Sequence, residues 1–197
     1  KDLSRSRRSR DAGVWAPPGR YAVRLSAGGQ TLTQPLVVVR DPRVPASDAD
    51  LVRQFELARR IEVERVRVGA ALGSAAALRK QAAALSEKAS GDAAAALADF
   101  GHELEPVAGP AVSPEEFYNL AEAAPTSLLR LTVSLARFQG TVESADAAPT
   151  PDAVAGFGQR QEAVEQGLAR WRDFLETGLP KVNAALAAAG LAPIRPE

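Results

Sequence analysis

The chain of 197 residues is long enough for one ordinary domain, or for one domain and a small module. Its hydrophobic fraction of 46% owes much to alanine and its aromatic fraction is only 5%, a composition typical of closely packed helices rather than of a β-sandwich or a deep ligand cavity. Lysine plus arginine equals aspartate plus glutamate at 24 each, which argues against nucleic acid or another polyionic partner.

The chain contains no cysteine, which excludes disulfides, thiolate metal sites and cysteine nucleophiles. It has no run of 18 apolar residues, so we expect no membrane insertion. No signal peptide is visible. Because the chain starts at Lys1 and contains no methionine, we expect it to be a piece of a longer polypeptide.

Residues 1–12 form a basic arm, with Arg5, Arg7, Arg8 and Arg10 set among serines. One interpretation is an arm that binds nucleic acid or anionic lipid, and the other is a solvated tail or linker. Because no aromatic residue lies among the arginines, we favour the flexible, solvated arm.

Residues 13–44 are predicted to form a β-hairpin module. After the turn signal at residues 17–19, the apolar side chains of Tyr21, Val23 and Leu25 alternate with small or polar ones, the period of a half-buried strand. Residues 27–29 reverse the chain, and residues 30–40 form a second strand. Pro35 lacks an amide hydrogen, so this strand should be an edge strand or be broken there.

Two strands alone are marginal in water. The hairpin therefore either docks on the helices or forms the last two strands of an immunoglobulin-like sandwich whose other strands lie elsewhere. Trp15 is expected to pack at the base of the hairpin, with ligand stacking as the alternative. The proline-containing connector at residues 41–45 marks a domain boundary, followed by a helical bundle over residues 45–197.

Capping and periodicity predict helices over about 47–88 and 92–105, another starting at Ser113, and then about 126–145 and 150–190. A Pro/Gly loop is expected at 106–110, and Pro180 should kink or restart the last helix. The fold class is mainly α: an elongated up-and-down bundle of three to four helices, preceded by the hairpin.

Apolar residues at helical spacing predict the buried faces. In the last helix the stripe comprises Val154, Phe157, Gln161, Val164, Leu168, Trp171, Leu175, Val182 and Leu186. In the first helix the stripe comprises Leu51, Phe55, Ala58, Ile61, Val68, Leu72, Ala75, Leu78, Ala82 and Leu85. Gly69 and Gly73 of the same helix could allow a neighbouring helix to come close. A solvated charged face is expected for Glu62, Glu64, Arg65 and Arg67, with a binding role as the alternative.

The sequence predicts no catalytic, cofactor-binding or metal-binding residue. His102 is the only histidine, so a surface or partly buried position is expected rather than a metal site or a triad. Glu115 and Glu116 are explained by helix capping rather than by paired catalytic acids. Gln161 is expected to be a register-fixing buried amide or to lie at the edge of the stripe, with ligand contact as the alternative. Trp171 is expected in the core.

Glycines 69, 73, 156, 158 and 167 lie within helical patterns rather than in a strand-to-helix turn, so no phosphate loop is predicted. There is also no calcium loop and no nucleic-acid motif.

Several segments carry a resemblance to a known family. They are residues 16–25, 30–39 and 41–44, the run 145–151, the tryptophan helix around 169–171, and residues 179–183. The chain resembles, over about residues 13–194, the C-terminal region of large secreted bacterial proteins with a sortilin-like or BNR-repeat β-propeller, often labelled glycosyl hydrolases. The shared motifs are structural, so the resemblance implies no catalytic residue in this chain. It does imply a periplasmic or extracellular parent protein.

The first functional hypothesis is a non-catalytic C-terminal accessory module that provides packing, spacing or protein–protein contact for a larger exported propeller protein. Its partner would be the upstream domain of the same polypeptide. The second is an auxiliary domain of a glycoside hydrolase or peptidase-like enzyme whose active site lies on the propeller. The third is a free-standing helical adaptor. The open hairpin edge and the apolar stripes also predict a possible homodimer.

Overall fold

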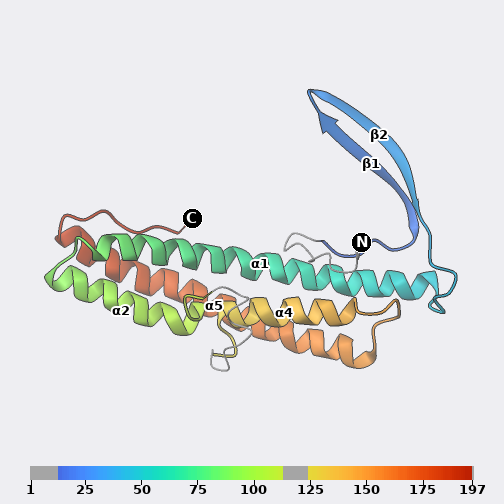
Figure 1. Ribbon diagram of the computed structural model, residues 1–197. Coiled ribbons are helices and arrows are strands. Elements are labelled where there is room, and N and C mark those ends of the chain that lie inside the picture. Colours follow the sequence, from blue (N-terminus) through green and yellow to red (C-terminus); the bar gives the residue numbers. More distant parts are fainter. Residues whose placement is uncertain (1–12, 113–123, 197) are drawn as a thin grey trace, which may run out of the picture. The chain divides into compact units, whose positions relative to one another are not determined.

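The computed structural model describes residues 13–112 and 124–196. These residues form a β-hairpin and a helical bundle, which confirms the predicted fold class (Figure 1). The elements are β1 (Gly19–Ala27), β2 (Gln30–Val38), α1 (Asp48–Ser86), α2 (Gly91–Ala108), α4 (Leu128–Val142) and α5 (Pro151–Ala188). The basic arm at 1–12 and the capping box at 113–116 lie outside the described residues.

The chain divides into two compact units that share helices. Unit 1 comprises Lys1–Glu62 and Gln139–Val154, and contains the hairpin and the first turns of α1. Unit 2 comprises Val63–Phe138 and Ala155–Glu197, and contains most of the bundle. The predicted domain boundary between residues 44 and 45 separates the hairpin from the bundle, which is a different division from these two compact units. It stays a prediction.

The hairpin turns at Gly28 and Gly29, whose φ angles are +56° and +76°. Positive φ at both central residues defines a two-residue turn that matches the twist of the flanking strands and favours glycine. The antiparallel register runs without a bulge from Ala27↔Gln30 to Gly19↔Val38. Strand β2 continues through Pro35, which is tolerated because both strands of a two-stranded sheet are edges.

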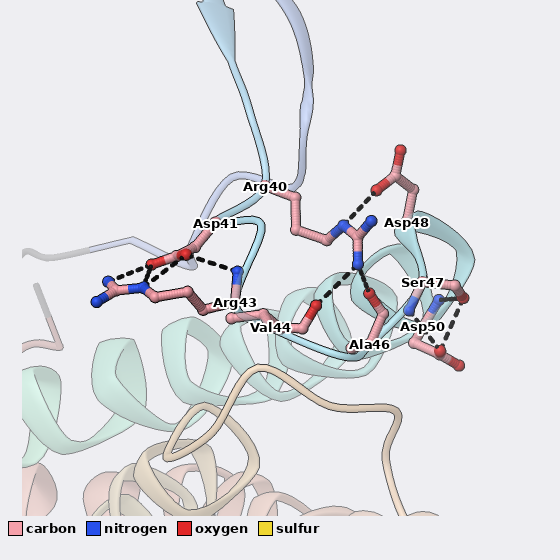
Figure 2. Close-up of polar contacts among 8 residues, drawn as sticks. All are labelled: Arg40, Asp41, Arg43, Val44, Ala46, Ser47, Asp48 and Asp50. Carbon is pink, nitrogen blue, oxygen red and sulfur yellow. Dashed lines mark hydrogen bonds and ion pairs between the residues drawn. The ribbon is translucent and has the colours of Figure 1, made fainter.

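Ser47 caps the start of helix α1, as the sequence predicts, and the structure shows that Asp50 completes a capping box with it. The backbone N–H of Asp50 donates to Ser47 Oγ at 3.2 Å, and the backbone N–H of Ser47 donates to Asp50 Oδ2 at 2.9 Å. Figure 2 shows this box beside the connector from β2. There Arg40 Nη1 donates to the carbonyl oxygens of Val44 and Ala46. These bonds hold the connector against the start of α1.

In unit 2, α5 contacts each of the other three described helices. Phe174 lies 5.2 Å from Phe100 of α2, between ring centroids. A Cβ added at Gly167 would lie 2.5 Å from Leu131 Cδ1 of α4 and 2.6 Å from the Thr126 carbonyl oxygen. Arg67 Nη1 of α1 pairs with Glu165 Oε1 at 2.6 Å. The apolar stripe of α5 therefore organises the unit.

Among the helical glycines, those that permit close approach are in α5 and not in α1. Gly69 and Gly73 are exposed, and a Cβ at either would meet nothing within 4 Å, so their predicted role is wrong. Gly167 is buried against α4. Gly178 is also buried, and a Cβ added there would lie 3.0 Å from the Phe174 ring. Val154, placed in the α5 stripe by its spacing, is 49% exposed because it lies in the first turn of the helix.

The predicted restart of the last helix at Pro180 and the predicted start of a loop at residue 106 do not occur, and a kink at Pro180 stays a prediction. Helix α5 continues through Pro180 to Ala188, and α2 continues through Pro106 to Ala108. Each proline removes one backbone hydrogen bond from its helix, but buried side chains close to it hold the helix in place. Leu179 and Val182 are buried beside Pro180, and Val107 is buried beside Pro106. Tertiary packing therefore outweighs the local penalty.

Helix α5 ends in a glycine motif close to residue 190, where the sequence predicts the end of this helix. Gly190 has φ +70°, its N–H donates to the Ala187 carbonyl oxygen, and the Leu191 N–H donates to the Leu186 carbonyl oxygen. The segment that follows is packed rather than frayed, because Ile194 is only 1% exposed.

Two amide side chains hold this C-terminal segment. Asn183 donates to and accepts from the backbone of Ile194, both at 2.9 Å. Gln81 of α1 does the same with the backbone of Arg195, at 2.8 and 2.9 Å. The segment is thereby fixed to α5 and α1 within unit 2.

Replacing Gly167 with alanine should destabilise the chain by about 1–3 kcal/mol, because the new methyl group overlaps a backbone carbonyl that cannot move aside. The matched variant Gly158→Ala, in the same helix with nothing within 4 Å, should stabilise it by about 0.5–1 kcal/mol. Urea denaturation measures both, and equal effects of the two substitutions would contradict the assigned close approach.

The capping box also predicts an acid dependence. Hydrogen bonds from the Ser47 side chain and backbone hold the pKa of Asp50 below its usual 3.8. A lowered folded pKa stabilises the fold above pH about 4, and the contribution is lost as the pH falls through the folded value. Asp50→Asn should therefore lose less stability than the wild type between pH 5 and pH 2. Urea midpoints measured across that range test this, and parallel curves would refute it.

Candidate functional site

One face of the hairpin is mainly apolar, with Gln34 opposite Val23 as a polar residue within it. Because residues of the same parity share a face of a strand, the register joins six side chains there: Tyr21, Val23, Leu25, Leu32, Leu36 and Val38. We call this set the apolar face. All its members except half-buried Val38 are exposed, with Leu25 63% and Leu32 65% exposed.

The opposite face of the hairpin is mainly polar and basic. Arg20 and Arg24 extend from β1, and Thr31 and Thr33 from β2. The Ser26 and Thr31 hydroxyls lie 2.9 Å apart across the strands. The hairpin is thus amphipathic, with the pattern of a sheet that covers a core on one side and meets water on the other.

Every residue from Arg20 to Val37 is exposed, so no residue in the described part of the chain buries the hairpin. Of the two predicted alternatives, docking on the helical residues of its own unit is not observed. Completion of a sandwich stays a prediction. Tyr21 is anchored locally, because its hydroxyl donates to the Pro17 carbonyl oxygen at 2.6 Å.

Trp15 was expected to pack at the base of the hairpin, and this is wrong: its side chain is 66% exposed. It is one of twelve residues that line a cleft of about 320 Å³ within unit 1, together with Pro17, Pro18, Phe55 and Glu143. The Trp15 backbone N–H donates to Glu143 Oε1 at 3.0 Å. The cleft is therefore lined by both an exposed tryptophan and a glutamate that accepts a hydrogen bond from the backbone of that tryptophan.

Gln54 of α1 orders the other wall of this cleft. Its Nε2 donates to the carbonyl oxygens of Val142, at 2.7 Å, and Ala145, at 2.5 Å, at the end of α4. Sequence reasoning did not identify Gln54 or Glu143, because these contacts join positions about ninety and more residues apart and leave no local pattern.

In the charged stretch of α1, which was predicted to be solvated, Glu64 is buried at 6% exposed, whereas Arg67 is exposed as predicted. Arg67 Nη1 bridges Glu64 Oε2 at 2.7 Å and Glu165 Oε1 at 2.6 Å. The hydrogen bond from Arg67 holds the pKa of Glu165 below its usual range. Gln161 Nε2 lies 3.3 Å from Glu64 Oε1, so this half-buried amide joins α5 to α1. Its predicted role in fixing the helix register stays a prediction.

Other predicted positions are confirmed. Trp171 is 6% exposed and stacks on Phe174 with ring centroids 5.8 Å apart, which places it in the core. His102 is exposed on α2. The five glycines named above lie in helices α1 and α5.

Among the described residues, no group of three or more histidine, cysteine, aspartate or glutamate side chains could hold a metal ion. None of the described helices is both long and apolar enough to cross a membrane.

Comparison of the chain with family models, with curated proteins and with solved structures found no match. The resemblance to the ends of secreted propeller proteins therefore stays a prediction. The candidate site is the hairpin with its apolar face, and the cleft at Trp15 is a secondary feature.

The contrast between the two tryptophans can be measured. In Trp171→Phe the remaining indole is exposed Trp15, and its fluorescence should be red-shifted and strongly quenched by acrylamide. In Trp15→Phe the remaining indole is buried, and its emission should be blue-shifted and resistant to quenching. Equal Stern–Volmer constants for the two variants would contradict the exposed position of Trp15.

Proposed function

We propose that this chain is a non-catalytic C-terminal accessory module of a larger exported propeller protein. It provides protein–protein contact through its hairpin, while the helical bundle provides packing and spacing. Its partner is the upstream domain of the same polypeptide. The single observation that carries the proposal is the uncovered apolar face on a regularly paired hairpin.

Energetics supports a covering partner for this face. Two-stranded hairpins are at best marginally stable in water, and they gain independent stability when a further strand or a packed element covers their apolar side. Burying a large aliphatic side chain is worth about 1.5–3 kcal/mol. Five of the six side chains of the apolar face are exposed, so a covering partner would gain several such contributions at once.

The connector supports a role in spacing. Asp41 and Arg43 form an ion pair at 2.6 Å, and hydrogen bonds from Arg43 hold the pKa of Asp41 below its usual range. Arg40 also lies 3.4 Å from Asp48 in the first turn of α1 (Figure 2). A flexible linker would lack such contacts, so β2 is joined to α1 by an ordered segment.

The cleft at Trp15 favours a second candidate function, an auxiliary domain of a glycoside hydrolase or peptidase-like enzyme whose active site lies on the propeller. The exposed Trp15 and the Glu143 carboxylate, which both line the cleft, offer an apolar surface and a hydrogen-bond acceptor to a substrate. In that case the cleft would contact a substrate that the neighbouring domain holds.

Hydrogen–deuterium exchange distinguishes these roles. In the isolated chain, residues 19–38 should exchange quickly, and in the polypeptide that includes the preceding domain they should be protected by about tenfold or more. The double substitution Val23→Glu/Leu25→Glu should remove that protection, because it places charge on the buried face. Thr33→Glu on the opposite face is the matched control and should retain it. Hairpin exchange that is equally fast in both polypeptides would refute the proposed docking.

A further inference from the structure

The two outer edges of the hairpin differ in their capacity to bind another strand. Ala27 and Gln30 flank the two-residue turn and form a hydrogen-bonded pair, since the carbonyl of the first turn residue accepts from the N–H of the fourth. Hydrogen-bonded and non-hydrogen-bonded pairs then alternate along an antiparallel ladder. The backbone groups of residues 20, 22, 24 and 26 in β1, and of 31, 33, 35 and 37 in β2, therefore point outward.

Pro35 falls on an outward position of β2. The outer edge of β2 thus lacks a donor in the middle of its length, which is a recognised way to block strand addition. The outer edge of β1 has all four donors, at Arg20, Ala22, Arg24 and Ser26. The side chains of these four residues are exposed, and no described residue covers this edge.

Charge selects the kind of strand that fits this edge. From Gly13 to Arg40 the chain carries three arginines and no acidic residue. Two of them, Arg20 and Arg24, extend from the open edge on the polar face of the hairpin. A strand paired with β1 would place its own side chains directly opposite these arginines, where opposite charges stabilise the pair and like charges destabilise it.

The same charges disfavour two other occupants. A second copy paired antiparallel about Ala22 would set Arg20 directly opposite Arg24 of the second copy, with like charges facing each other. The stretch before Gly13 is also rich in arginine and has the same sign of charge as the edge.

We propose that the outer edge of β1 is a strand-addition site for an acidic amphipathic β-strand. Acidic side chains of that strand lie opposite Arg20 and Arg24. Its apolar side chains extend the apolar face next to Tyr21, Val23 and Leu25. The inference rests on the proposed function, and it specifies which edge of the hairpin the partner uses and the charge of the partner.

The test uses the full chain and a short synthetic peptide in which glutamate and valine alternate, with a lysine-for-glutamate peptide as the control. The glutamate peptide should bind about tenfold more tightly than the lysine peptide and should slow amide exchange at residues 20, 22, 24 and 26. Residue-resolved exchange by NMR and a binding titration measure these effects.

Two proline variants distinguish the edges. Ala22→Pro removes an outward donor from β1, and Thr33→Pro removes one from the edge of β2 that Pro35 already blocks; neither position donates within the hairpin. Ala22→Pro should weaken peptide binding about tenfold, and Thr33→Pro should leave it unchanged. The inward amides of residues 21, 23 and 25 report whether each variant keeps its hairpin.

Charge reversal provides a variant that leaves the backbone edge intact. Arg20→Glu/Arg24→Glu should reverse the preference between the two peptides. The inference is overturned if the glutamate peptide does not bind, if it binds Ala22→Pro as well as the wild type, or if the lysine peptide binds equally. It is also overturned if β1 amides become protected with rising concentration of the chain alone, which would indicate a second copy. The proposed function is tested separately: it fails if the amides of residues 19–38 are not protected from exchange in the longer polypeptide.

Discussion

The apolar stripe of α5 is the constraint on which unit 2 depends. A helix of 38 residues with one apolar face cannot remain uncovered in water, and α1, α2 and α4 each supply part of its cover. The contacts change in kind along its length. The Arg67–Glu165 ion pair joins it to α1, a close glycine approach joins it to α4, and aromatic packing joins it to α2. Removing any one of these leaves α5 exposed on that side.

The hairpin shows the same constraint left unsatisfied. Its alternation of apolar and polar residues is that of a strand pair with one buried side, yet no described residue buries it. In α5 the stripe finds its partners within the chain, whereas in the hairpin the equivalent surface is presented outward. Function is therefore proposed at the hairpin and not in the bundle, because a surface that is already covered has little capacity to bind a partner.

The sequence predicted much of this architecture because the relevant signals are local. Ser47 with Asp50 and Thr150 mark helix starts, Gly190 marks a helix end, and Gly28-Gly29 marks the hairpin turn. The failures have non-local causes. Pro180 and Pro106 are locally unfavourable in helices, but packing of their neighbours overrides the penalty.

The features of the candidate site were likewise predictable from the sequence only where their signals are local. The alternation of side chains from Tyr21 to Leu25 and the position of Pro35 can be read from the sequence by itself, and they determine which residues share a face. Only the tertiary structure decided that this face is exposed, that Trp15 lies open beside Glu143, and that Glu64 is buried with Gln161. Periodicity establishes that a residue shares a face with its neighbours, but whether that face is covered depends on segments far away in the chain. For that physical reason the sequence determined the elements and their amphipathic faces, and the tertiary structure decided which of those faces is free to bind.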